Sequence, residues 1–132
     1  MIPLLVIDDD RSLLDLYHQI LERAGFTVDT APSGEEGIRL FDCGEYALVI
    51  TDLMMGGVDG NAVAQHIRAS EKGAIPIIGI SGTPWRAEAH QFDAVMHKPV
   101  TMKELVKSIN LLMGTTPNGE GSQAGGVSRV AR

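Results

Sequence analysis

The sequence predicts a doubly wound α/β fold, in which helices cover both faces of a five-stranded parallel sheet. Two observations lead to this prediction. Short apolar runs alternate along the chain with segments whose apolar residues repeat at helical spacing. Most of the runs are apolar throughout, as expected for parallel strands that are buried on both faces. The strands are predicted at 4–7, 26–30, 47–51, 75–80 and 94–96.

Helical patterns follow these strands and complete a series of five βα units. Each pattern is opened by a residue type that accepts hydrogen bonds from the first amides of a helix. Gly25 follows the first pattern as a stop signal. The expected starts are Asp10, Ser33, Asp59 or Asn61, and Thr101. The apolar stripes consist of Leu13, Tyr17, Ile20, Leu21 and Ala24; Ile38 and Phe41; Val63 and Ile67; and Leu105, Ile109 and Leu112.

Composition limits the classes of protein that the chain can represent. Its 132 residues, 44% hydrophobic and 21% charged, suit one globular domain. No apolar run approaches the roughly 18 residues of a membrane span, and the N-terminus lacks the basic region of a signal peptide. Cys43 is the only cysteine, so we expect no internal disulfide and a cytoplasmic location. The net charge of −6 argues against nucleic acid as a partner.

The character of the sequence changes at residue 114. Residues 114–132 are rich in Gly, Ser and Thr and have almost no apolar periodicity. We therefore expect one domain over 1–113, followed by a flexible tail or by the truncated start of a linker. Sequence reasoning leaves these two alternatives open.

Polar residues follow the predicted strands at the points where the strands end. Asp8 and Asp9 follow the first strand in "LVIDDDRSL", and Asp52 follows the third. Ser81 follows the fourth strand and Lys98 the fifth. The carboxyl ends of parallel strands share one edge of the sheet, so these side chains are expected to meet in one crevice.

These residue types suit a divalent-cation site that supports phosphoryl transfer. Clustered carboxylates repel one another, and a hard divalent cation such as Mg²⁺ prefers oxygen ligands of this kind. The Asp52 carboxylate is a candidate nucleophile for a phosphorus atom, which would give an acyl phosphate. Lys98 and the Ser81 hydroxyl would help to neutralise the charge of the transferred group. The sequence thus favours Mg²⁺-dependent phosphoryl transfer to Asp52.

Five short motifs, in this order and spacing, carry a resemblance to a known family. They are "LLVIDDD", "VITDLMM", "VDG", "IIGISGT" and "HKPV". Together they resemble the receiver domain of two-component response regulators over roughly residues 2–113. The resemblance implies a flavodoxin-like (βα)5 fold. It also implies a signalling role in a two-component system or phosphorelay, and not turnover of a metabolite.

The resemblance also implies roles for individual residues. Asp52 would accept the phosphoryl group from a histidine kinase or phosphotransfer protein. Asp9 and Asp52 would bind Mg²⁺ through their side chains, Asp8 through a water molecule, and Met54 through its backbone carbonyl. Ser81 and Lys98 would contact the phosphoryl group. Phosphorylation would then change contacts with an unknown downstream protein, through a surface of the fourth helix, fifth strand and fifth helix.

The chain departs from the family pattern at three places. Gly56 and Gly57 stand where the family usually has a proline after the methionine, which predicts a looser loop. Val95 occupies the position of the switch aromatic. The segment from Ser81 to Lys98 is shorter than usual, so the fourth helix is expected to be short or distorted.

The chain as a whole has two alternative interpretations, and some single residues also have alternatives. A degenerate receiver would act as an interaction module without phosphorylation. A haloacid-dehalogenase-like phosphatase would also use clustered acids, but the chain is short for that class and lacks a further acidic motif after Lys98. Asp10 is expected to be a helix cap only, and the histidines show no spacing typical of metal ligands. Trp85 suits either an exposed contact or a partly buried helix start.

Overall fold

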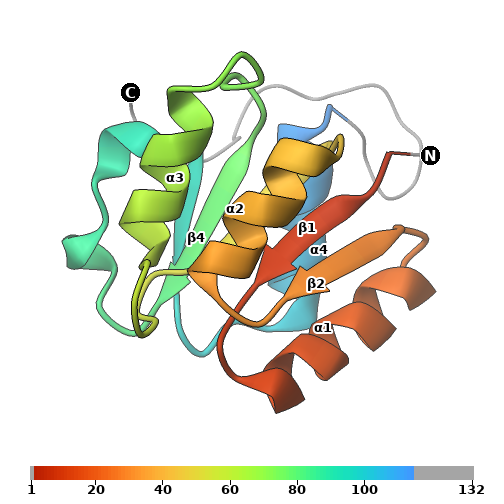
Figure 1. The fold of residues 1–132 in the computed structure, drawn as a ribbon. Coiled ribbons are helices and arrows are strands. Elements are labelled where there is room, and N and C mark those ends of the chain that lie inside the picture. Colours follow the sequence, from red (N-terminus) through yellow and green to blue (C-terminus); the bar gives the residue numbers. More distant parts are fainter. Residues whose placement is uncertain (1, 115–132) are drawn as a thin grey trace.

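A computed structural model describes residues 2–114 as a five-stranded parallel sheet with the strand order β2-β1-β3-β4-β5 (Figure 1). The doubly wound fold predicted from the sequence is confirmed. The strands are β1 (Leu4–Ile7), β2 (Val28–Ala31), β3 (Leu48–Asp52), β4 (Ile77–Ser81) and β5 (Ala94–His97). Four strands begin or end one or two residues away from their predicted bounds, while all five predicted strands are present.

Two layers of helices bury the two faces of the sheet (Figure 1). Helices α1 (Arg11–Arg23) and α4 (Met102–Leu112) pack on one face, with Leu14, Leu21 and Leu105 in the core. Helices α2 (Gly34–Cys43) and α3 (Gly60–Arg68) pack on the other. In the described part of the chain, no helix has the length and apolarity to span a bilayer.

All four α-helices in residues 2–114 begin at predicted residues. The side chains of Asp10, Ser33, Asp59 and Thr101 each accept a hydrogen bond from a backbone amide three residues later. Of the two candidates for α3, Asp59 is thus the cap. Such a bond satisfies an amide that the helix itself cannot, so the polar residue at each strand-to-helix turn fixes where the helix starts.

The expected fourth helix is replaced by two single 3₁₀ turns, η1 (Pro84–Arg86) and η2 (Ala89–Gln91). The shortening predicted for this region is confirmed, but the prediction of five complete βα units is wrong at the fourth. Only 12 residues separate β4 from β5, since Ser81 ends one strand and Ala94 begins the next. Pro84 lies near the start of this stretch and cannot donate a helical hydrogen bond.

Side chains from α3 hold this irregular segment in place. The Asn61 amide donates to the carbonyl of Arg86 (2.9 Å) and accepts from the amide of Glu88 (2.9 Å). The Arg68 guanidinium donates to the carbonyl of Gln91 and to the buried carboxylate of Asp93 (2.8 Å). Because these bonds replace the regular bonds of a helix, the segment between β4 and β5 is attached to α3.

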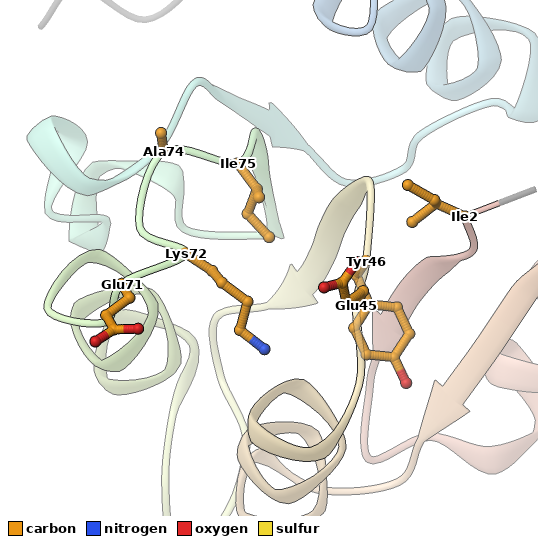
Figure 2. A pocket seen from close by; sticks show the side chains of 7 residues that line it. All are labelled: Ile2, Glu45, Tyr46, Glu71, Lys72, Ala74 and Ile75. Atoms are coloured by element: carbon orange, nitrogen blue, oxygen red, sulfur yellow. The ribbon is translucent and has the colours of Figure 1, made fainter.

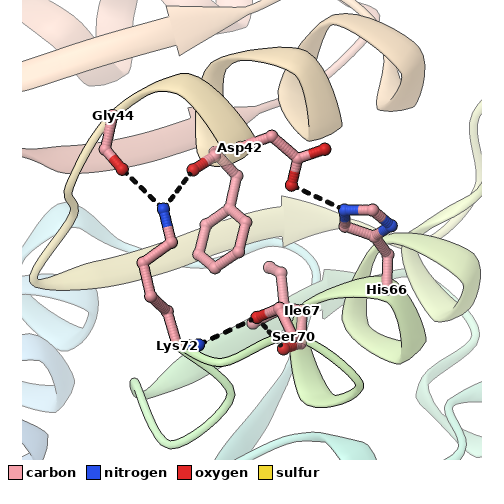
Figure 3. Close-up of polar contacts among 7 residues, drawn as sticks. Asp42, Gly44, His66, Ile67, Ser70 and Lys72 are labelled. Carbon is pink, nitrogen blue, oxygen red and sulfur yellow. Dashed lines mark hydrogen bonds and ion pairs between the residues drawn. The ribbon is translucent and has the colours of Figure 1, made fainter.

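The C-terminal end of α2 makes polar contacts with α3 and with the segment that follows α3 (Figure 3). The ammonium of Lys72 donates to the carbonyl oxygens of Phe41 (2.8 Å) and Gly44 (2.7 Å), and lies 4.7 Å from the centre of the Phe41 ring. The ring nitrogen Nε2 of His66 lies 2.8 Å from Oδ1 of Asp42. Lys72 therefore satisfies carbonyls that the end of a helix leaves free.

The prediction of a flexible tail or linker from residue 114 falls, apart from Gly114, outside the described residues. The domain boundary at 113 stays a prediction.

Candidate functional site: an acidic crevice at the carboxyl edge of the sheet

Three carboxylates meet at the carboxyl edge of the sheet. Asp8 and Asp9 follow β1, and Asp52 is the last residue of the neighbouring strand β3. Each offers an oxygen, and these oxygens lie within 4.8 Å of one another. Asp8 and Asp52 are 2% and 6% exposed, whereas Asp9 is exposed. The prediction that the acids of two separate strands converge is thus confirmed.

The third acid of the DDD run is placed differently from the other two. Asp10 caps α1 through a bond from the Leu13 amide to its side chain (3.2 Å). Its own amide donates to Oδ1 of Asp8 (2.9 Å). The turn between β1 and α1 thereby orients Asp8 and directs the Asp10 side chain into the cap. The run of three acids thus combines two cluster members with one helix cap.

Burial makes the charges of this cluster costly. It raises the pKa of Asp8 to about 6 from the ordinary value of 3.8; the amide of Asp10 opposes this shift, and the charge of Asp52 adds to it. Burial also raises the pKa of Asp52, against the opposing charge of Lys98. A divalent cation bound between these carboxylates would offset the same cost.

Lys98 brings a positive charge to the cluster from the end of β5. Its Nζ lies 3.3 Å from Oδ1 of Asp52, and its backbone amide donates to the carbonyl of Ser81 (2.9 Å). This backbone bond continues the β4–β5 pairing to the residue that carries the ammonium. The predicted meeting of Lys98 with Asp52 is confirmed.

Ser81 ends β4, beside the strand that carries Asp52, and is 1% exposed. Its hydroxyl accepts a hydrogen bond from the amide of Thr83 (2.9 Å) and lies 3.2 Å from the Thr83 hydroxyl. The Asp52 carboxylate accepts its own bond from the amide of Leu53 (3.1 Å). The Ser81 hydroxyl is thus hydrogen-bonded to Thr83.

The loop after Asp52 is shaped by Gly57 and Glu35. Met54 is exposed and Met55 is buried. The amide of Val58 donates to the Glu35 carboxylate, and a side chain at Gly57 would meet the same carboxylate at 2.5 Å. The assignment of the Met54 carbonyl as a metal ligand stays a prediction.

One neighbour of the acids was not predicted as part of the site. Tyr17 was predicted only as a member of the apolar stripe of the first helix, and it is 4% exposed. Burial raises its pKa to about 12, and the charges of Asp8 and Asp52 add to the shift. The only sequence signal was an aromatic hydroxyl within an otherwise aliphatic stripe.

Other residues singled out in the sequence lie outside the cluster. His66 contacts Asp42, and His90 and His97 are exposed. Trp85 is 75% exposed, which decides between its two predicted settings in favour of the exposed one. Val95 lies on β5 opposite Gly79 and packs against the core.

A groove of about 390 Å³ lies at the opposite edge, where the strands begin (Figure 2). Tyr46, which precedes β3, and Ile75, which precedes β4, form part of its wall. The Lys72 side chain also lines it, but the ammonium is already bound to two carbonyls of the α2 end. The groove is therefore separate from the acidic crevice.

A family model described as the response regulator receiver domain matches residues 4–110. The chain belongs to this receiver family. The receiver also matches the transcriptional regulatory protein ResD of Bacillus subtilis, with 34% identity over 115 residues, which are 83% of this chain and 47% of ResD. The chain thus spans about half the length of this curated relative.

Solved receiver structures share the fold. The response regulator TrrA of Thermotoga maritima in complex with Mg²⁺-BeF has 31% identity and a TM-score of 0.78, over 85% of this chain and 99% of that one. A complex of the histidine kinase ThkA with TrrA also matches, with 32% identity and a TM-score of 0.76, over 85% and 98% of the two chains. This chain is therefore the receiver domain of a two-component signalling protein.

Proposed function

We propose that this receiver accepts a phosphoryl group on the Asp52 carboxylate in a Mg²⁺-dependent reaction, and that the modification changes its contacts with another protein. The single observation that carries the proposal is the meeting of Asp8, Asp9 and Asp52 within 4.8 Å, with Lys98 3.3 Å from Asp52. Three clustered acids, two of them buried and one paired with an ammonium, suit a site whose missing positive charge is supplied by a ligand.

The residues present fit Mg²⁺. The donors are carboxylate oxygens, which this ion prefers. Without the ion, burial disfavours the charged forms of Asp8 and Asp52. Asp9 and Asp52 would hold the ion directly, Asp8 through water, and the Met54 carbonyl would complete the protein's share. When bound, Mg²⁺ supplies positive charge for the phosphoryl oxygens.

The chain's own residues would divide the work of transfer. A carboxylate oxygen of Asp52 forms the new bond to phosphorus while the bond from phosphorus to the donor's histidine nitrogen breaks, and the released imidazole takes up a proton from solvent. The Lys98 ammonium, already beside Asp52, balances charge on the transferred group. The Ser81 hydroxyl would donate to a phosphoryl oxygen.

The partners follow from the same proposal. A histidine kinase, or a phosphotransfer protein that carries phosphohistidine, would supply the phosphoryl group, and an unidentified downstream protein in the cytoplasm would read the change. In a longer protein, such as one of ResD's length, the reader would be a second domain of the same chain.

One observation favours a second candidate function. The helix expected between β4 and β5 is replaced by two 3₁₀ turns, and Val95 occupies the position of the switch aromatic. A receiver with these changes would suit an interaction module that works without phosphorylation. Because Asp8, Asp9 and Asp52 are all present and close together, we favour the function that depends on phosphorylation.

Intact mass spectrometry after incubation with acetyl phosphate tests the proposal. We expect a gain of one phosphoryl group that requires Mg²⁺ and is absent in Asp52→Asn. Labelling at another residue would contradict the role of Asp52. No gain with steady release of phosphate would indicate a phosphatase or a very short-lived acyl phosphate. No gain and no release would favour the interaction module.

A further inference from the structure

The loop that follows Asp52 is held against the start of α2 by close contacts. The amide of Val58 donates to the carboxylate of Glu35, in the first turn of α2, at 3.4 Å. Gly34 is buried, and a Cβ there would overlap the carbonyl oxygen of Val58. The Val58 side chain also packs against the core. The end of the loop is therefore attached to a helix that lies 23 residues earlier in the chain.

The same carboxylate lies beside Gly57. The backbone of Gly57 has a φ of +76°, which glycine adopts readily and other residues do not. A Cβ at position 57 would lie 2.5 Å from Oε2 of Glu35, so a side chain there would displace the carboxylate from the Val58 amide. The contact thus depends on two residues, since Glu35 supplies the acceptor and Gly57 leaves the space for it.

The loop has little else in its own sequence to restrict it. Gly56 and Gly57 stand together, and a Cβ at position 56 would meet nothing within 4 Å. Met54, whose carbonyl the proposed function assigns to the metal, is exposed and lies two residues before Gly56. An ion that binds a loop carbonyl must fix the loop, and a loop that is already fixed loses less conformational entropy.

We propose that Glu35 is a positioning residue, which holds the loop after Asp52 in the conformation that binds the metal ion and so raises the affinity for Mg²⁺. This role rests on the proposed function, in which the Met54 carbonyl contacts the ion. Glu35 acts through the Val58 amide and not as a ligand. The N-terminal turn of α2 thereby becomes part of the support of the acidic crevice.

The test compares two replacements of Glu35. Glu35→Ala removes the acceptor, whereas Glu35→Gln removes the charge and keeps an oxygen that can accept from the amide. Titration of backbone amide shifts by NMR measures the affinity for Mg²⁺. We expect Glu35→Ala to bind Mg²⁺ about 3- to 10-fold more weakly than the unmodified protein, the range for one net hydrogen bond. Glu35→Gln should bind within about twofold of the unmodified protein.

Glu36→Gln is the matched control for the loss of a negative charge. Glu36 lies in the same turn of α2, but its carboxylate accepts from Nε of Arg39 at 2.9 Å. Its replacement should leave the affinity for Mg²⁺ within about twofold. A matched urea midpoint for all variants shows that the fold is retained.

A second readout needs no metal. The Val58 amide hydrogen exchanges with water at a rate that NMR measures, and its bond to Glu35 slows this exchange. In the metal-free protein, we expect faster exchange at Val58 in Glu35→Ala and nearly unchanged exchange in Glu35→Gln.

Gly57→Ala tests the same contact from the side of the loop. The methyl group displaces the Glu35 carboxylate and adds the strain of a positive φ, so Mg²⁺ should bind more weakly. In the Glu35→Ala background there is no carboxylate to displace. The further loss caused by Gly57→Ala should therefore be smaller there than in the unmodified protein.

Three results would overturn this role. They are an unchanged affinity for Mg²⁺ in Glu35→Ala, an equal loss in Glu35→Gln, and strictly additive losses in the double variant. Failure of the proposed function looks different, because the unmodified protein itself would then bind no Mg²⁺, while the exchange of the Val58 amide would still separate the two Glu35 variants. That outcome would overturn the metal site and, with it, the role of Glu35 toward the ion.

Discussion

The ammonium nitrogen of Lys98 lies 3.3 Å from Oδ1 of Asp52, at the ends of two strands that are separated in the sheet by β4. The two side chains differ in exposure: Asp52 is buried, whereas the Lys98 side chain is 36% exposed. Water therefore screens the contact on one side only. Its role is to supply a positive charge to an edge that carries three acids.

Replacing Lys98 by methionine should raise the pKa of both buried acids. Burial already raises the pKa of Asp52 and of Asp8, and in each case the charge of Lys98 opposes the shift. NMR titration of the side-chain carboxyl carbons measures both pKa values. Lys103→Met, an exposed position on α4, is the control and should leave them in place. Equal titration curves in the two variants would contradict the contact.

The contribution of Asp8 to the stability of the metal-free protein should decrease as the pH rises from about 4 to about 7. The folded-state pKa of Asp8 is about 6, above the ordinary 3.8, so in this range the folded protein binds more protons than the unfolded chain. Asp8→Asn removes this dependence and still offers an oxygen to the amide of Asp10. We expect the variant to be about 1–3 kcal/mol more stable at pH 7 and equal near pH 4.

Urea unfolding in the presence of a chelator, at both pH values, measures the difference between Asp8→Asn and the unmodified protein. The difference isolates Asp8, since the other titratable groups are the same in both proteins. A gap that stays constant with pH would show that Asp8 is not the group responsible.

The crevice was more predictable from the sequence than its surroundings. Asp52 was placed correctly because an apolar run that ends in a carboxylate marks the end of a buried parallel strand, and all such ends share one edge. The Arg68–Asp93 pair, 25 residues apart, leaves no periodic signal in the sequence. The segment that it holds contains helix-forming residues, yet tertiary bonds from α3 keep it in 3₁₀ turns.

Asp10→Ala separates the helix cap from the acidic cluster. The loss of the bond from the Leu13 amide should destabilise the fold by about 0.5–2 kcal/mol. Mg²⁺-dependent labelling by acetyl phosphate should persist, since the Asp10 side chain is engaged in the cap. Urea unfolding and intact mass measure the two effects separately. Labelling lost in a folded Asp10→Ala protein would place Asp10 in the site.

The Arg68–Asp93 pair should contribute strongly to stability. The Asp93 carboxylate accepts from Arg68 (2.8 Å) and from the amide of Ile77 (2.8 Å), and it is 3% exposed. Asp93→Ala leaves a partly buried guanidinium without its counter-charge, so we expect a loss of about 3–5 kcal/mol in the free energy of unfolding.

The matched control for Asp93→Ala is Asp42→Ala. Asp42 also contacts a basic side chain, that of His66, but both side chains of that pair are more than a third exposed. Its removal should cost less than about 1 kcal/mol. Urea unfolding compares the two variants at one pH. Similar losses in both would show that the buried pair does not anchor the segment after β4.

Gly79→Ala should destabilise the sheet where Gly79 of β4 faces the buried ring of Phe92. A Cβ at position 79 would lie 3.0 and 3.1 Å from two ring carbons of Phe92, which is fully buried, so the ring would have to shift. We expect a loss of about 1–3 kcal/mol in urea unfolding. Gly82→Ala, whose Cβ would meet nothing within 4 Å, should be nearly neutral. Adding Phe92→Leu to Gly79→Ala should restore part of the loss, because the smaller side chain leaves space for the new methyl group; strictly additive losses would contradict the contact.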